Sequence, residues 1–270
     1  MERCTKLKLA DLHSHTKYSF DSQTEPEALV LSAIDKGLDV IAITDHADID
    51  FEDCGMPFEP RSEERKAELL SLKRKYNDKI KLIYGIELGQ PNNKRHLADK
   101  LVNENGYELV IGSIHTLKNM PDFSLFDYKK MLDYPEIIDS LYKRYIDDLI
   151  ELADVSYVNV ITHVTYVLRY VQAAGGDLDL SVYYAKYEEL FKRIIKNGKA
   201  LEINTSNLRR GFGTTMPGED LIKLYAECGG KLVTVGSDAH RVHEIGANLT
   251  EGYDLVTRYG LKTLEINELY

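Results

Sequence analysis

The segment DLHSHT, residues 11–16, decides the fold, because it ends a short apolar run with two closely spaced histidines. The same arrangement recurs at AITDHA (42–47), YGIELG (84–89), GSIHT (112–116), VITHV (160–164) and VGSDAH (235–240). Each of these runs is rich in Val, Ile or Leu and closes with a residue that can ligate a metal. A series of strands that stop at a ligand indicates a barrel with its chemistry at the carboxyl ends of the strands.

The potential ligands number nine, and only two of the chain's eight histidines, His96 and His243, lie outside the set. The nine residues are His13, His15, Asp21, His46, Glu87, His115, His163, Asp238 and His240. A lone histidine at a strand end is most often a hydrogen-bonded structural residue. Independent structural histidines have no reason to choose so many strand ends, so the joint pattern favours one metal site.

Strands and helices alternate along the chain. The predicted strands are Lys8–Leu12, Asp39–Thr44, Lys81–Glu87, Leu109–Ile114, Tyr157–Thr162, Ala200–Asn204 and Leu232–Gly236. The predicted helices are Glu25–Lys36, Ser62–Tyr76, Glu136–Ala153, Ser181–Lys196, Gly218–Cys228 and Ile245–Tyr259. Such alternation implies parallel strands with right-handed crossovers. We therefore predict an α/β fold, a distorted (β/α)7 TIM-like barrel, in a single domain over residues 1–270.

An open, doubly wound sheet is the structural alternative. It is less favoured because only a closed barrel brings ligands from nearly every strand end together. Thr24 and Glu27 stand in capping-box positions before the first predicted helix, and Gly37 and Gly198 stand where helices end. Residues 48–60 and 119–135 are expected to form long loops over the site.

Composition narrows the function classes. A net charge of −10 disfavours a surface for nucleic acid, whose phosphates are bound largely by Lys and Arg. Cys4, Cys54 and Cys228 are odd in number and far apart, as is usual for free thiols in a reducing compartment. The amino terminus lacks the apolar core of a signal peptide, and no apolar run is long enough to span a membrane. We expect a cytoplasmic protein without a membrane partner.

The residue types in the predicted ligand set indicate which metals the site would bind. His13 and His15, two residues apart at a strand end, point to the same side and can hold one cation. Asp238 and His240 repeat this spacing. Glu87 would be costly to bury as an unpaired carboxylate, and bridging two metals removes that cost. Mixed imidazole and carboxylate ligation suits Zn, Mn or Fe and disfavours Ca.

These motifs resemble those of the PHP (polymerase and histidinol phosphatase) superfamily. The resemblance is carried by His13-x-His15, Thr44-Asp45-His46, Gly85-Ile86-Glu87, Ser113-Ile114-His115, Thr162-His163 and Ser237-Asp238-Ala239-His240, in the family's order. It implies a (β/α)7 barrel with three divalent metal ions. The first would be held by His13, His15, Glu87 and Asp238; the second by Glu87, His115 and His163; and the third by Asp21, His46 and His240.

Three segments, 110–115, 162–169 and 201–211, resemble the stand-alone histidinol-phosphate phosphatases of that superfamily. This resemblance implies that Arg169 and Arg209 bind the substrate phosphate, a task that suits the planar guanidinium fork. It also implies hydrolysis of L-histidinol phosphate in histidine biosynthesis, with a metal-activated hydroxide as the nucleophile. The expected partner is therefore a small phosphate ester. The oligomeric state stays open.

Three other functions are compatible with a metal centre of this kind. A PHP-type nuclease or nucleotide phosphatase would favour a basic groove or an added polymerase module, and the sequence has neither. A protein-tyrosine phosphatase would need a broader cleft, which the sequence does not reveal. A metal-stabilised scaffold without activity would tolerate lost ligands, whereas every ligand position is filled here. Asp45, next to His46, is interpreted either as a carboxylate that orients an imidazole or as a helix cap.

Overall fold

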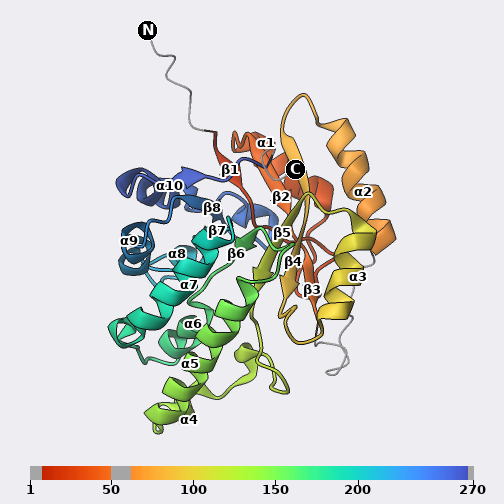
Figure 1. Cartoon of the computed structure of the whole chain (residues 1–270). Helices are drawn as coiled ribbons and strands as arrows, with labels where there is room; N and C mark the ends of the chain where they lie inside the picture. Colours follow the sequence, from red (N-terminus) through yellow and green to blue (C-terminus); the bar gives the residue numbers. More distant parts are fainter. Residues whose placement is uncertain (1–7, 50–61, 267–270) are drawn as a thin grey trace.

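The computed structural model describes residues 8–49 and 62–266, and its centre is a parallel barrel (Figure 1). The barrel strands are β1 (Ala10–Asp11), β2 (Val40–Ile43), β4 (Lys81–Gly89), β5 (Leu109–Ser113), β6 (Val160–Ile161), β7 (Ala200–Asn204) and β8 (Leu232–Gly236), paired in that order. The Leu12 amide donates to the Val235 carbonyl at 3.1 Å, and Ser14 bridges Ala239 in parallel, so β1 meets β8. The predicted distorted (β/α)7 barrel is confirmed over the open sheet.

Two short strands were not predicted. β3 (His46–Asp48) pairs with the second half of β4, where His46 lies opposite Glu87. β9 (Lys262–Thr263) pairs with the start of β8. β3 therefore carries one predicted ligand directly beside another.

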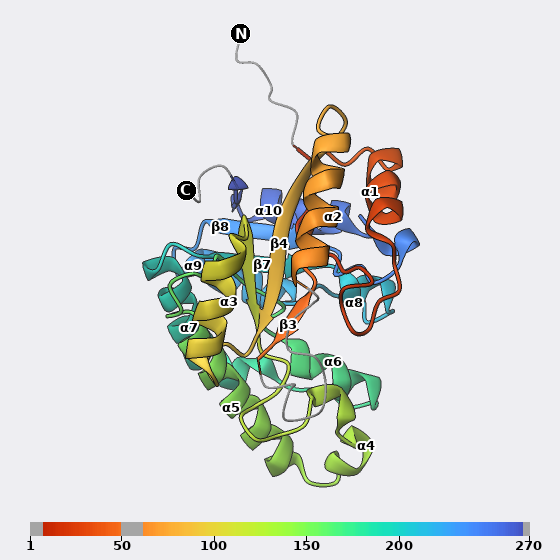
Figure 2. The same cartoon turned by 90° about the vertical axis from the view of Figure 1, so that its right-hand side faces the viewer.

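Helices surround the barrel. The longer ones are α1 (Pro26–Asp35), α2 (Ser62–Lys75), α3 (Arg95–Asn105), α5 (Pro135–Leu152), α6 (Tyr166–Ala173), α7 (Tyr184–Lys196), α9 (Glu219–Glu227) and α10 (Leu249–Arg258). Shorter turns are η2 (Phe123–Leu125), α4 (Tyr128–Met131), η3 (Leu180–Tyr183), α8 (Ser206–Arg209) and η4 (Val242–Glu244). The helices α4 and α6 lie beyond the carboxyl end of β4 (Figure 2). None of the described helices is long and apolar enough to cross a membrane.

All six predicted helices are present, with corrections at their starts. The predicted capping box at Thr24 is wrong, because the Thr24 hydroxyl donates to the His240 carbonyl at 2.8 Å and α1 begins without a side-chain cap. The helices predicted from Ser181 and Ile245 begin later, at Tyr184 and Leu249, each after a 3-10 turn. Gly37 and Gly198 do adopt positive φ, 73° and 64°, as a helix end requires.

Of the two predicted loops, the one at 119–135 lies within the described residues. Residues 119–135 contain η2 and α4, so this segment is partly helical, and it contributes Asp122, Ser124 and Leu125 to the central cavity. It does lie over the site. The loop predicted at 48–60 falls almost entirely outside the described residues, as do Cys4 and Cys54.

The alternation of side chains along β4 explains why a carboxylate points into the barrel. Ile83 packs in the inner apolar cluster, while Leu82, Ile86 and Leu88 pack outward against the helices. Because side chains alternate along a strand, Glu87 faces inward on the same side as Ile83, at the carboxyl end. The interior of the barrel is therefore apolar toward the amino ends of the strands and polar at their carboxyl ends.

Candidate metal centre

All nine predicted ligands converge at the carboxyl ends of the barrel strands. Four groups of three have ligand atoms within 4.8 Å of one another: His15, His46 and His240; His13, His15 and Asp238; His13, Glu87 and His163; and His46, Glu87 and His115. Asp21 lies beside them, with Oδ2 3.0 Å from His240 Nε2 and Oδ1 3.7 Å from His46 Nε2. Segments separated by more than 200 residues thus form one site.

Glu87 is the hub of the cluster. Its Oε1 lies 2.9 Å from His163 Nε2 and 3.2 Å from His115 Nε2. Its Oε2 lies 3.0 Å from His46 Nδ1 and 3.2 Å from His13 Nε2. Because each carboxylate oxygen faces a different pair of imidazoles, Glu87 has the geometry of a bridging ligand.

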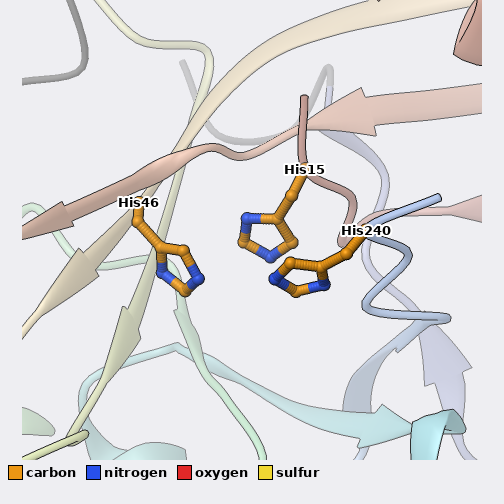
Figure 3. Close-up of side chains that lie close together, drawn as sticks. All are labelled: His15, His46 and His240. Atoms are coloured by element: carbon orange, nitrogen blue, oxygen red, sulfur yellow. The ribbon is translucent and has the colours of Figure 1, made fainter. Parts of the chain in front are cut away.

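A group of three histidines forms the outer part of the centre, and Figure 3 shows these rings turned toward one another. The His15 ring stacks on His46 and on His240, with centroids 4.3 and 4.1 Å apart. Stacked imidazoles would repel one another if each were protonated. Burial, with the neighbouring His240 and His46, lowers the pKa of His15 to about 3. His15 is thus a neutral imidazole that keeps a lone pair for a cation.

The donor set fits divalent metal ions. Among the described residues, the buried atoms His15 Nε2, His46 Nδ1 and His163 Nδ1 have no hydrogen-bond partner, which is unusual for buried nitrogens. Burial alone would raise the pKa of the Glu87 carboxyl, but the imidazoles of His13, His46 and His115 hold it well below its ordinary value. Imidazole nitrogens, once a metal has displaced their protons, and ionised carboxylates are the ligands that Zn, Mn and Fe prefer.

Two ligands occupy strained backbone. His163 and Asp238 have φ angles of +25° and +54°, in the region that residues other than glycine rarely adopt. The His163 amide donates to Glu202 Oε2 at 2.9 Å, and the Asp238 amide donates to the His13 carbonyl at 2.8 Å. Strain of this kind persists where surrounding bonds hold it and is frequent at functional sites.

The predicted phosphate-binding arginines lie beside the centre, in different settings. Both line a cavity of about 1080 Å³ that also contains Glu87, His163 and Asp238. Arg169 is held by Asn207 Oδ1 at 2.9 Å and by Ser206 Oγ, with Nη2 3.7 Å from Asp238. Arg209 is engaged differently, because its Nη1 and Nη2 donate to the carbonyls of Ser237 and Asp238. Arg209 therefore supports the end of β8.

Four buried polar residues around the ligands escaped the sequence reasoning. Glu202 lies 2.6 Å from His13 Nδ1, and Asp48 lies 2.8 Å from His115 Nδ1. Arg65 pairs with Asp45 at 2.7 Å, while Ser19 Oγ lies 3.0 Å from Asp45 and 3.1 Å from His15 Nδ1. Asp45 thus pairs with Arg65 and is linked through Ser19 to the His15 imidazole, which favours the orienting role over the helix cap. A usable signal existed for Glu202, since it faces inward on the strand Ala200–Asn204.

A closed parallel barrel with a buried cluster of imidazoles and carboxylates at its carboxyl ends defines a metal-binding (β/α) barrel protein. A model of the PHP domain matches residues 11–206. The chain belongs to the PHP domain family, as its motifs predict.

Relatives and a solved structure narrow the position within the family. The histidinol-phosphatase of Lactococcus lactis subsp. lactis (strain IL1403) is 27% identical over 263 residues, covering 96% of this chain and 94% of the relative. The probable histidinol-phosphatase of Clostridium acetobutylicum is 27% identical over 256 residues, covering 93% and 94%. The crystal structure of the Lactococcus lactis histidinol phosphate phosphatase, complexed with zinc, L-histidinol and phosphate, matches with a TM-score of 0.81 at 25% identity, over 95% of each chain. The resemblance to histidinol-phosphate phosphatases is confirmed.

Proposed function

We propose that this protein is a divalent-metal-dependent phosphomonoesterase that hydrolyses L-histidinol phosphate to L-histidinol and phosphate. The observation that carries the proposal is that Arg169 lines one cavity with seven of the nine candidate ligands, its Nη2 3.7 Å from Asp238 Oδ2. Metal ligands and a phosphate-binding cation must face the same phosphoryl group for hydrolysis. The names of the relatives and the zinc, L-histidinol and phosphate bound by the Lactococcus lactis enzyme support the substrate.

Three ions are proposed, held as the family pattern implies. His13, His15, Glu87 and Asp238 would hold one ion, Glu87, His115 and His163 a second, and Asp21, His46 and His240 a third. The spatial groups support this scheme, because His115 and His163 each group with Glu87, while His46 groups with His240. When bound, such ions lower the pKa of water and neutralise charge on phosphate oxygens.

The remaining residues of the cavity have distinct roles in the proposal. Arg169, fixed by Asn207 and Ser206, orients the phosphate and offsets the charge that spreads over its nonbridging oxygens. Phe20 and Tyr166 line the same cavity and offer apolar surface to the leaving group. Asp122 places one carboxylate in this cavity, which suits a leaving group that carries an amine.

The test is phosphate release by Mn- or Zn-loaded protein from L-histidinol phosphate, compared with a single-stranded oligonucleotide and a phosphotyrosine peptide. Strong preference for L-histidinol phosphate, lost on chelation, supports the proposal. Turnover of another substrate instead would keep the metal chemistry and replace the substrate with that of a nuclease or protein-tyrosine phosphatase. Metal binding without turnover of any of the three substrates would favour the alternative that the protein is a metal-stabilised scaffold without activity.

Replacing Arg169 with alanine is expected to lower kcat/KM by about 10²-fold while metal content is retained. Hydrogen bonds to charged groups contribute about 1.5–3 kcal/mol each, and each 1.4 kcal/mol is tenfold in rate. Arg169→Lys keeps the charge but loses the guanidinium fork, so its kcat/KM should lie between those of the wild type and Arg169→Ala. Steady-state kinetics and elemental analysis measure both quantities. Wild-type kinetics in Arg169→Ala would remove the residue from phosphate binding.

Arg209→Ala is expected to raise KM and weaken inhibition by inorganic phosphate, with a smaller effect than Arg169→Ala. The reason is that two of its guanidinium nitrogens already donate to the carbonyls of Ser237 and Asp238. Inhibition constants for phosphate in the two variants give the comparison. A larger loss in Arg209→Ala than in Arg169→Ala would reverse the assignment of the main phosphate ligand.

A further inference from the structure

A buried carboxylate outside the predicted ligand set contacts two of its members. Glu202, on β7, is 1% exposed and its Oε1 lies 2.6 Å from His13 Nδ1. Its Oε2 accepts the His163 amide at 2.9 Å and a bond from Asn204 Nδ2 at 3.2 Å. A buried carboxylate needs such partners, because an unpaired one would be costly. Glu202 therefore links the end of β7 to the ends of β1 and β6.

The contact with Glu202 determines which nitrogen of His13 faces the centre. His13 Nε2 points the other way, 3.2 Å from Glu87 Oε2 and 3.8 Å from Asp238 Oδ1. A carboxylate accepts hydrogen bonds and cannot donate them when ionised, so Nδ1 must carry the proton that it shares with Glu202. With the Nδ1 proton held by Glu202, Nε2 is the nitrogen left to give its lone pair to a bound metal, beside Glu87 and Asp238.

A glycine on β8, Gly236, leaves space for the contact between His13 and Glu202. A Cβ atom added at Gly236 of β8 would lie 2.5 Å from His13 Cβ and 2.8 Å from Glu202 Oε1. A side chain at position 236 would therefore displace the pair. The other oxygen of Glu202 accepts the amide of His163, whose φ is +25°. The Glu202 carboxylate therefore contacts the imidazole ring of His13 and the strained backbone of His163.

We infer that Glu202 is a positioning residue for the metal centre: it fixes the His13 tautomer through Nδ1 and holds the backbone of His163. This inference rests on the proposed metal centre. Outer partners of metal-bound histidines typically affect metal affinity by about 10–100-fold when removed. The same range is expected here, with the folded barrel retained.

Glu202→Gln is the sharpest variant. Glutamine offers one acceptor oxygen where glutamate offers two, and its amide nitrogen donates. Either the His13 or the His163 bond is then lost, or His13 takes the other tautomer and points a hydrogen at the centre. Glu108→Gln is the matched control, because Glu108 is a partly buried carboxylate that accepts the Tyr84 amide at 2.9 Å near the amino end of β4.

The experiment measures Zn and Mn affinity by chelator competition and bound metal by elemental analysis, with circular dichroism as the check on folding. A 10–100-fold weaker affinity in Glu202→Gln, with Glu108→Gln like the wild type, supports the inference. Equal affinity in both variants overturns it. Absence of metal binding by the wild-type protein would instead contradict the proposed function, so the two failures are distinct.

A second measurement does not depend on the variant folding. In the Zn-loaded wild-type protein, nitrogen-detected NMR of the imidazoles, assigned with His13→Asn, should find the His13 proton on Nδ1. A proton on Nε2 overturns the inference, because His13 would then neither donate to Glu202 nor ligate through Nε2.

Discussion

Glu87→Gln is expected to remove bound metal and phosphatase activity together, with activity falling by about 10³-fold. A metal ion supplies several kcal/mol of transition-state stabilisation, and each 1.4 kcal/mol is tenfold in rate. The two oxygens of Glu87 face different imidazole pairs, His115 and His163 on one side and His13 and His46 on the other. The amide nitrogen of glutamine has no lone pair for a metal, so one side must lose its ligand.

The measurement is metal per protein by elemental analysis, with kcat/KM for phosphate release from the same preparation. Glu108→Gln again provides the control, since it removes a carboxylate from the opposite end of the barrel. His96→Ala is a second control, because His96 lies exposed on α3, outside the cluster. Wild-type metal content and turnover in Glu87→Gln would take Glu87 out of the centre.

The barrel and the convergence of its candidate ligands were predictable because both depend on local patterns. At Lys81–Glu87, seven residues contain both the apolar run that predicts a strand and the candidate ligand that ends it. The period-two alternation then places Glu87 inside the barrel, beside Ile83 and away from Leu82. The relative placement of ligands from different strands follows from barrel closure alone.

The partners of the ligands were not predictable, because they depend on pairings between distant segments. His13 and Glu202 are 189 positions apart, and His115 and Asp48 are 67 apart. The three-residue strand β3 is too short for a clear local signal. The helices α3 and α6 were also not predicted, although α3 ends at Gly106 with positive φ. Thr24 has the local chemistry of a helix cap, yet its hydroxyl bonds to His240, 216 positions away. A tertiary contact therefore replaced the local one.

The burial of Arg65 was also not predictable, because α2 is a strongly charged helix in which Arg65 resembles its exposed neighbours. The side chain is fully buried, with Nε 2.7 Å from Asp45 Oδ2. Its Nη2 donates to the carbonyls of Ile43 at 3.0 Å and Gly85 at 2.6 Å. Arg65 thus joins α2 to the ends of β2 and the middle of β4. Asp45 in turn accepts the Thr16 amide at 2.5 Å.

Arg65→Met is expected to lower the free energy of unfolding by about 3–5 kcal/mol, because it leaves the Asp45 carboxylate buried without its cation. Arg65→Lys should recover part of this loss, since a lysine supplies the charge without the fork. Arg74→Met, at an exposed position of the same helix, is the control and should change stability by no more than about 0.5 kcal/mol. Denaturant titration of the metal-free proteins gives these values.

The pH dependence of this loss identifies its cause. Burial would raise the pKa of Asp45, but Arg65 holds it below the ordinary value in the folded protein. This ion pair therefore stabilises the fold above the unfolded pKa and loses its effect as pH falls through the folded pKa. In Arg65→Met, burial acts without Arg65, so Asp45 takes up a proton more readily. The stability difference between variant and wild type should thus shrink as pH falls from the raised Asp45 pKa of the variant to the lowered pKa of the wild type, a window that spans the ordinary value of about 4. A difference independent of pH would assign the loss to packing around Tyr84, whose ring lies 5.1 Å from the guanidinium, instead of to the buried charge.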